Sequence, residues 1–274
     1  MSGMGDARTS PSRRRMLGEV AAFCALAFLL SWLLWLPALL SDGLVVRGQG
    51  WPTHFPGLVG PALAALLLVW WAGPAARADL RARFRWPSAR GWALMLAPGA
   101  VVLGLLLAGV GAGWEGLTRH TGLPVLPVLA VLGLAVLING FGEEIGWRGW
   151  ILPRLQWLMG PVWGSMALGP IWALWHLPLF FVQESYLALP WAGLVFGFGL
   201  GMVAASLVLA HVAARAGILG AAVWHALYNM GVATDLGGPA SQVMAGLALV
   251  WALLLVLTPA GRRALRVPAP SPAS

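Results

Sequence analysis

The fold is decided by the stretch NGFGEEIGWRGW, which runs from Asn139 to Trp150 in a chain of 274 residues. It ends a long apolar run, yet it carries Glu143, Glu144 and Arg148 close together. A charged side chain in hydrocarbon is costly unless it is paired or hydrated, so an ionisable group inside a membrane span is a functional candidate by default. The stretch therefore predicts the base-bearing part of an intramembrane active site.

The composition predicts a membrane protein. Hydrophobic residues make up 59% of the chain and charged residues 9%, whereas soluble domains average about 25% charged residues. A soluble protein of this composition would expose large apolar patches and aggregate. The net charge of +8 comes from arginine alone, because the chain has no lysine. These arginines lie in short segments between apolar runs, which argues against a nucleic-acid partner and predicts contact with membrane lipids.

Eight apolar runs are each near the length of about 20 residues that a helix needs to cross about 30 Å of hydrocarbon. Runs this long predict helices, because a span has to satisfy its own backbone hydrogen bonds. The expected fold is an all-α polytopic membrane protein, with about eight transmembrane helices in one bundle. The runs cover residues 20–40, 57–73, 91–112, 124–147, 160–182, 190–211, 217–233 and 241–258.

The distribution of arginine predicts that both chain ends are cytoplasmic, since positive charge is retained on that side. With eight spans, all but Arg47 and Arg119 of the 17 arginines fall on the side of the termini. The coding bias towards Ala, Gly, Pro and Arg favours a bacterial plasma membrane. We expect a transmembrane domain at 16–258, with a catalytic core at about 124–233. Disordered cytoplasmic tails are expected at 1–15 and 259–274.

The two neighbouring glutamates are expected to have different partners. Glu144 and Arg148 lie four residues apart with the acid first, the favourable order for an ion pair on one helical face. This pair is expected to be structural. Glu143 points about 100° away, on the face of Asn139 and Trp147, and has no cation beside it in the sequence. It is the candidate general base; a buried ion pair with one interfacial carboxylate is the non-catalytic alternative.

Two further motifs place imidazoles and an amide in other spans. In WALWHLP, Trp172 and His176 share a helical face, so the indole can shelter the imidazole. In HALYN, His225 and Asn229 share one turn. A lone polar residue in a span is more often an interhelical hydrogen bond. A carboxylate, two imidazoles and an amide together can activate water and stabilise an oxyanion.

These side chains leave the cofactor open. Two histidines with a carboxylate suit Zn²⁺, whereas asparagine is an unusual zinc ligand. Zn²⁺ held by His176, His225 and Asn229 therefore stands beside metal-free activation of water by the glutamate. The remaining histidines outside the spans, His54 and His120, fall in connecting segments and are expected at the surface.

The motifs Glu-Glu-x-x-x-Arg, aromatic-x-x-x-His and His-x-x-x-Asn, in this order and in separate spans, resemble the CAAX prenyl protease and bacteriocin-processing family of intramembrane metalloproteases. The resemblance covers about residues 124–233, and Trp172 stands where that family usually has Phe. It implies an eight-helix bundle with a polar cavity reached from the cytoplasmic side. It also implies a catalytic Glu143, with Glu144, Arg148, His176, His225 and Asn229 completing the motifs.

We therefore expect an intramembrane endopeptidase in which a glutamate activates water to hydrolyse a peptide bond of a membrane-associated protein or peptide. The alternative is a non-proteolytic scaffold, or an immunity-type binding protein that keeps the same polar core. A transporter is disfavoured, because no paired broken helices occur in corresponding halves. The sequence leaves the oligomeric state and the identity of the substrate open.

Overall fold

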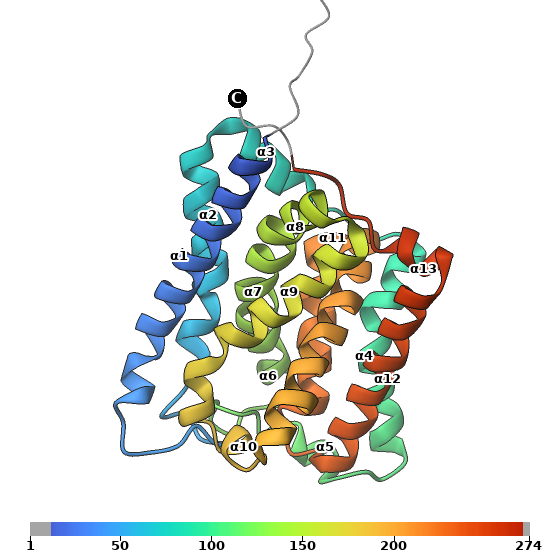
Figure 1. Cartoon of the computed structure of the whole chain (residues 1–274). Helices are drawn as coiled ribbons and strands as arrows, with labels where there is room; N and C mark the ends of the chain where they lie inside the picture. Colours follow the sequence, from blue (N-terminus) through green and yellow to red (C-terminus); the bar gives the residue numbers. More distant parts are fainter. Residues whose placement is uncertain (1–11, 271–274) are drawn as a thin grey trace, which may run out of the picture.

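The computed structural model describes residues 12–270, which form helices joined by connecting segments with isolated β-bridges. The helices run up and down between two ends of one bundle, and the described chain begins and finishes at the same end (Figure 1). We call it the arginine-rich end, because arginines lie there in the first turn of α1 (Arg13–Leu39), in α3 (Pro74–Ala82) and in α13 (Pro259–Ala264). The short helices α5 (Gly113–Gly116) and α10 (Glu184–Leu187) lie at the opposite end (Figure 1).

The first half of the chain surrounds the motif-bearing helix. The side chain of Ser12 caps α1, and that of Ser88 caps α4, which satisfies backbone N–H groups that a helix start leaves unpaired. Gly73 and Pro74 separate α2 from α3. The elements are α1 (Arg13–Leu39), η1 (Phe55–Val59), α2 (Gly60–Ala72), α3 (Pro74–Ala82), α4 (Ala89–Leu107) and α5 (Gly113–Gly116).

A single apolar helix of 32 residues, Val128–Met159, carries the Glu-Glu motif. It consists of α6 (Val128–Leu134), η2 (Ala135–Phe141), α7 (Gly142–Gly146), η3 (Trp147–Ile151) and α8 (Leu152–Met159). The segments η2 and η3 are π-helical, so wider turns flank the two glutamates on both sides, as is frequent at functional sites. Gly160, with φ 81°, ends this helix and begins α9 (Pro161–Trp175).

The second half contains another reversal. Gly217 has φ 69° and ψ −168° and interrupts α11 (Gly199–Val232). Beside it, the Ile218 N–H donates to the Arg83 carbonyl just after α3, whereas Thr234 pairs with His120 at the other end of the bundle. The two parts of α11 therefore run in opposite directions. The remaining elements are η4 (Leu177–Phe181), α10 (Glu184–Leu187), η5 (Gly193–Phe198), α12 (Gly237–Leu257) and α13 (Pro259–Ala264).

Among the described residues, six helices are long and apolar enough to cross a membrane by length and composition. Of the eight expected runs, five correspond to one of these helices each, two lie together in Gly193–Val232, and one forms α9. The run 160–182 forms α9, which has only 15 residues, and the runs 190–211 and 217–233 join across Gly217. The all-α polytopic class is confirmed. The six helices are Arg13–Leu39, Phe55–Ala72, Ala89–Leu107, Val128–Met159, Gly193–Val232 and Gly237–Leu257.

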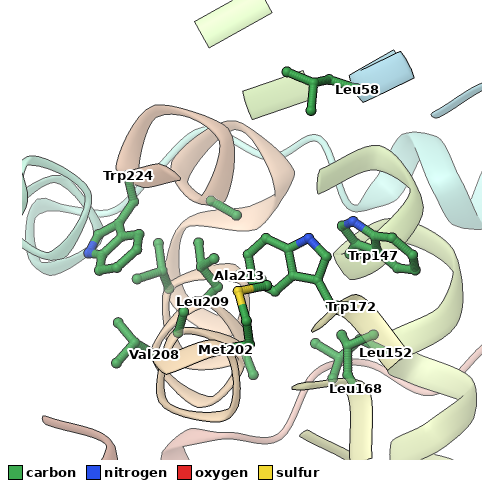
Figure 2. Close-up of a cluster of buried hydrophobic side chains, with 14 of the residues drawn as sticks. Leu58, Trp147, Leu152, Leu168, Trp172, Met202, Val208, Leu209, Ala213 and Trp224 are labelled. Carbon is green, nitrogen blue, oxygen red and sulfur yellow. The ribbon is translucent and has the colours of Figure 1, made fainter. Parts of the chain in front are cut away.

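Glycines allow the backbones of neighbouring helices to approach the motif-bearing helix closely. A Cβ on Gly140 would lie 2.5 Å from the Ala222 carbonyl oxygen, and one on Gly146 would lie 2.5 Å from the Pro61 carbonyl oxygen. The helix is thus held between α2 and α11, with both glutamates inside. The surrounding core is aromatic and aliphatic. Figure 2 shows Trp147 and Trp172 with Leu152 of α8 and Leu168 of α9 beside them.

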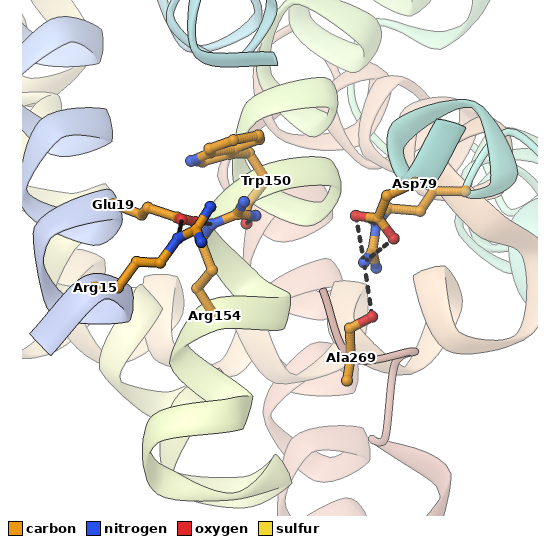
Figure 3. A network of polar contacts seen from close by, with 7 residues as sticks. Arg15, Glu19, Asp79, Trp150, Arg154 and Ala269 are labelled. Carbon is orange, nitrogen blue, oxygen red and sulfur yellow. Dashed lines mark hydrogen bonds and ion pairs between the residues drawn. The ribbon is translucent and has the colours of Figure 1, made fainter. Parts of the chain in front are cut away.

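Polar contacts join the elements of the arginine-rich end. Glu19 of α1 accepts from Arg15 at 3.0 Å and from Arg154 of α8 at 2.6 Å. The guanidinium of Arg154 also lies 3.4 Å from the ring centre of Trp150 (Figure 3). These contacts explain how Arg154, which the sequence places in a connection, is buried within a helix.

The expected tails differ from what the structure shows. Residues 1–11 and 271–274 lie outside the described chain, and α1 already begins at Arg13. The segment 259–270, expected to be disordered, forms α13 and then packs on the bundle. The side-chain amide of Gln156 donates to the Leu265 carbonyl at 2.8 Å and accepts from the Val267 N–H at 3.0 Å. The side chains of Leu265 and Val267 are buried. A segment rich in Pro, Ala and Ser does not indicate this packing from its composition.

Candidate active site

The hairpin at Gly160 brings Trp172 of α9 against Glu143. The indole N–H of Trp172 donates to Oε2 of Glu143 at 2.7 Å. Glu143 is 2% exposed and Trp172 is 3% exposed, so the bond is shielded from solvent. A hydrogen bond to an ionised acceptor is about twice as strong as one between neutral groups. One oxygen of the candidate base is therefore held, and Oε1 is left for other chemistry.

Glu144 accepts two hydrogen bonds through one oxygen. Its Oε1 lies 2.9 Å from Nη1 of Arg148 and 2.9 Å from Nδ1 of His225. All three side chains are buried. The expected helical pair with Arg148 is present, and His225 joins it from the second part of α11. Because Nδ1 of His225 faces a carboxylate, it carries the proton and leaves Nε2 available.

His176 is held by the backbone of its own helix. Helix α9 ends at Trp175, two residues before Pro178, which cannot donate a helical hydrogen bond. Nδ1 of His176 lies 2.8 Å from the Trp172 carbonyl oxygen. A carbonyl only accepts, so this nitrogen carries the proton and Nε2 is left available. The ring packs edge-on against Trp175 and Phe198, with centroids 4.7 Å and 5.4 Å away.

The ring of Trp172 completes the cluster. The guanidinium carbon of Arg148 lies 4.4 Å from its centroid, and the His225 ring meets it edge-on at 5.4 Å. Glu143 and His225 therefore both contact the same indole. The structure thus gathers three of the four expected catalytic residues, Glu143, His176 and His225, around one indole.

The two candidate asparagines, Asn139 and Asn229, make fewer contacts with the cluster around Trp172. Asn229 lies one turn beyond His225 and is half-buried. Asn139 is 4% exposed, and its Oδ1 has no hydrogen-bond partner within residues 12–270. Neither side chain is joined to the Trp172 cluster by a hydrogen bond within the described chain.

The side chains of the candidate site also include groups that can bind metal ions. Within the part of the chain that the structure describes, no group of three or more His, Cys, Asp or Glu side chains is arranged to hold one. His176 and His225 do present Nε2 with Nδ1 bonded to an oxygen, as metal-binding imidazoles do. The histidines and carboxylates of the described residues therefore do not by themselves supply a complete ligand set.

Two histidines expected at the surface are buried. His54 is 6% exposed and His120 is 1% exposed, and both rings contact Phe55, with centroids 5.2 Å and 5.6 Å away. Burial lowers the pKa of His54 to about 3 and that of His120 to about 4. Their connecting segments fold back over the helix ends, which the local sequence does not indicate.

Comparison with known proteins addresses the same region. Residues 124–231 match the family described as type II CAAX prenyl endopeptidase, Rce1-like. Over this region, which is less than half of the chain, the protein is similar to the CAAX protease family. A curated relative, CAAX prenyl protease 2 of Methanococcus maripaludis, is 43% identical over 61 residues, covering 22% of this chain. That match spans 21% of the relative, about a fifth of its length. The resemblance of the three motifs to CAAX proteases is confirmed.

Proposed function

We propose that the chain is an intramembrane endopeptidase of the CAAX protease type, in which Glu143 is the general base. The observation that carries the proposal is the buried cluster around Trp172. It contains a carboxylate with one oxygen held, and two imidazoles whose Nδ1 atoms are already bonded. These are the groups that a glutamate-activated water requires, in a site shielded from bulk solvent.

Each group has a role in the proposed hydrolysis. Oε1 of Glu143 takes a proton from water while the water oxygen attacks the carbonyl carbon of the scissile peptide. Nε2 of His176 accepts the other hydrogen of that water and orients it. The proton on Glu143 then passes to the leaving amine as the C–N bond breaks, which yields a carboxylic acid and an amine and regenerates the base.

The oxyanion of the intermediate needs hydrogen-bond donors. His225 is paired with the Glu144 carboxylate, which stabilises an imidazolium in the way the triad aspartate does in serine proteases. Its Nε2–H then donates to the oxyanion, and the amide of Asn229, one turn away, supplies a second donor. This division gives the two glutamates different tasks, because Glu143 moves a proton and Glu144 holds a charge.

The proposed substrate is a membrane-associated peptide. The matched family and the relative are named for CAAX prenyl substrates, so a peptide ending in a prenylated Cys-a-a-X sequence is the first probe. We use an internally quenched farnesylated peptide of this kind in detergent micelles, beside the same peptide without the farnesyl group. Cleavage of both would indicate that the peptide, rather than the lipid, is recognised.

The decisive variant is Glu143→Gln. We expect cleavage to fall at least about 100-fold, as for loss of a general base, with thermal unfolding in detergent unchanged. Glu115→Gln, the same change at an exposed carboxylate, is the matched control and should keep the wild-type rate. A Glu143→Gln variant that cleaves as fast as wild type would exclude the proposed base and favour a scaffold or immunity-type role.

Metal dependence is measured on the same preparations. We propose that His176, His225 and Asn229 are the positions to vary if elemental analysis of the purified protein finds Zn²⁺. Dialysis against a chelator, followed by the cleavage assay, separates a metal-assisted reaction from the metal-free one.

A further inference from the structure

Trp172 makes four different contacts inside the candidate site. Its indole N–H donates to Glu143 at 2.7 Å, and its carbonyl accepts from His176 at 2.8 Å. One face of its ring meets the Arg148 guanidinium at 4.4 Å, and the His225 ring lies edge-on at 5.4 Å. A side chain present only to fill space would not need this combination of polar and aromatic contacts.

Among the buried indoles of residues 12–270, that of Trp172 donates to a carboxylate, whereas that of Trp35 donates to the backbone carbonyl of His54. Within residues 12–270, four other buried tryptophans leave the indole nitrogen without a hydrogen-bond partner: Trp147, Trp150, Trp175 and Trp224. An unpaired indole nitrogen is therefore tolerated in the bundle. The N–H of Trp172, in contrast, meets the one carboxylate that lacks a salt bridge at the centre of the site.

Holding one carboxylate oxygen has a geometric effect. The last torsion of a glutamate side chain is broad, so an unrestrained carboxylate rotates and exchanges its two oxygens. A short bond from Trp172 to Oε2 fixes that torsion and keeps Oε1 in one direction. A base fixed in this way avoids the large losses of rate that follow small displacements of a catalytic group.

We propose that Trp172 is a positioning residue for the hydrolysis: its N–H holds Oε2 of Glu143 so that Oε1 faces the water, and its carbonyl holds His176 with Nε2 free. This inference rests on the proposed function. It assigns to the N–H group, rather than to the bulk of the ring, the contribution that Trp172 makes to the reaction rate.

A spectroscopic test needs no substrate. The protein is labelled with ¹⁵N-tryptophan, and the Trp172 indole signal is identified by its loss in Trp172→Phe. We expect this N–H proton to resonate downfield of that of Trp147, which has no partner, and to move upfield in Glu143→Gln, where the acceptor is neutral. An indole signal that does not respond to Glu143→Gln would overturn the proposed hydrogen bond.

The kinetic test separates the N–H from the ring. Trp172→Phe keeps the aromatic face and the backbone carbonyl but removes the donor, and should lower kcat about tenfold or more while KM stays within about twofold. Trp147→Phe, which removes another buried indole from the helix that carries Glu143, should leave kcat unchanged. Equal losses in the two variants would show that the effect is packing, which overturns the inference.

A third variant keeps the result interpretable if phenylalanine disturbs folding. Site-specific replacement of Trp172 by benzothienylalanine preserves the shape of the indole and puts sulfur in place of the N–H. It should reproduce the loss of kcat at wild-type thermal stability, and wild-type kcat would overturn the role of Trp172. If cleavage does not depend on Glu143 at all, the proposed function fails as well, whatever Trp172→Phe does.

Discussion

At the residue scale, Glu144 is the polar centre of the bundle. One of its oxygens accepts from Arg148 and from His225, and all three side chains are almost inaccessible to solvent. Arg148 in turn stacks on Trp172. The charge of one acid is therefore shared between a cation on its own helix and an imidazole on another.

Removing either member of the Glu144 pair should destabilise the protein strongly. Loss of one partner leaves the other charge buried and unpaired, which costs about 3–5 kcal/mol. For a chain of this size we expect Glu144→Ala and Arg148→Ala to lower the melting temperature in detergent by about 6–20 °C. Arg90→Ala, at an exposed position, should leave it unchanged. Unchanged melting in both core variants would contradict the structural role of the pair.

The two buried histidines at the opposite end predict a response to acid. The pKa of each is lowered by burial, to about 3 for His54 and about 4 for His120, whereas unfolded histidine titrates near 6.5. Below about pH 6.5 these histidines bind protons in the unfolded chain but stay neutral in the folded chain. The free energy of unfolding present at neutral pH therefore decreases as the pH falls towards 4.

This response is measured as the melting temperature between pH 7.5 and pH 4.5, in wild type and in His120→Gln. The decline should be shallower in the variant, because one of the two histidines that resist protonation is gone. A wild-type profile that stays flat over this interval would show that the histidines are accessible to protons in the folded protein.

At the element scale, the apolar runs predicted the helices well and the turns poorly. The runs 124–147 and 160–182 place Glu143 near the cytoplasmic end of one expected span and His176 towards the outer end of the next, which would keep the two side chains apart. The structure removes this conflict, because the helix of Glu143 continues to Met159 and α9 is only 15 residues long. The runs 124–147 and 160–182 leave residues 148–159 as a connection that contains Arg154, whose burial depends on Glu19, 135 residues away in sequence.

The reversal within α11 should depend on its glycine. Gly217 has φ 69°, and an added Cβ would lie 2.5 Å from the Arg83 carbonyl oxygen. Gly217→Ala therefore introduces both strain and a backbone clash, and should destabilise by about 1–3 kcal/mol. Gly201→Ala is the matched control, since Gly201 is helical with open space around it. There alanine should be neutral or slightly stabilising, and equal melting temperatures of the two variants would refute the turn.

At the scale of the whole molecule, the order of the motifs predicted which residues gather but not how they pair. Glu143, His176 and His225 could be selected because polar groups are rare in apolar spans. Their partners depend on the rotation of helices 29 to 81 residues apart in sequence, and on π-helical turns that change which side chains share a face. Hence the sequence grouped His225 with Glu143, whereas the structure bonds it to Glu144.

The two ends of the bundle also differ in charge, from which we propose that both termini are cytoplasmic. The described chain begins and finishes at one end of the bundle (Figure 1). The first turn of α1, together with α3 and α13, contributes arginines at that end, as the positive-inside rule requires. At the opposite end, Arg47 and Arg119 are both paired with Asp235.

Reporter fusions test this orientation in a bacterial host. Alkaline phosphatase should be inactive when fused after the C-terminus and active when inserted in the segment 109–112, whereas green fluorescent protein should fluoresce at the C-terminus. The reverse pattern would contradict the orientation.

The Glu144–Arg148 pair has a consequence for how the protein is made. The two residues are four apart and can neutralise each other as soon as their helix forms. The contact with His225 has to wait for 81 more residues, which takes about 4–16 s at a synthesis rate of about 5–20 residues per second. Throughout that interval Arg148 is the counter-ion that accompanies Glu144 into the lipid, so the salt bridge serves membrane insertion before it serves the folded protein.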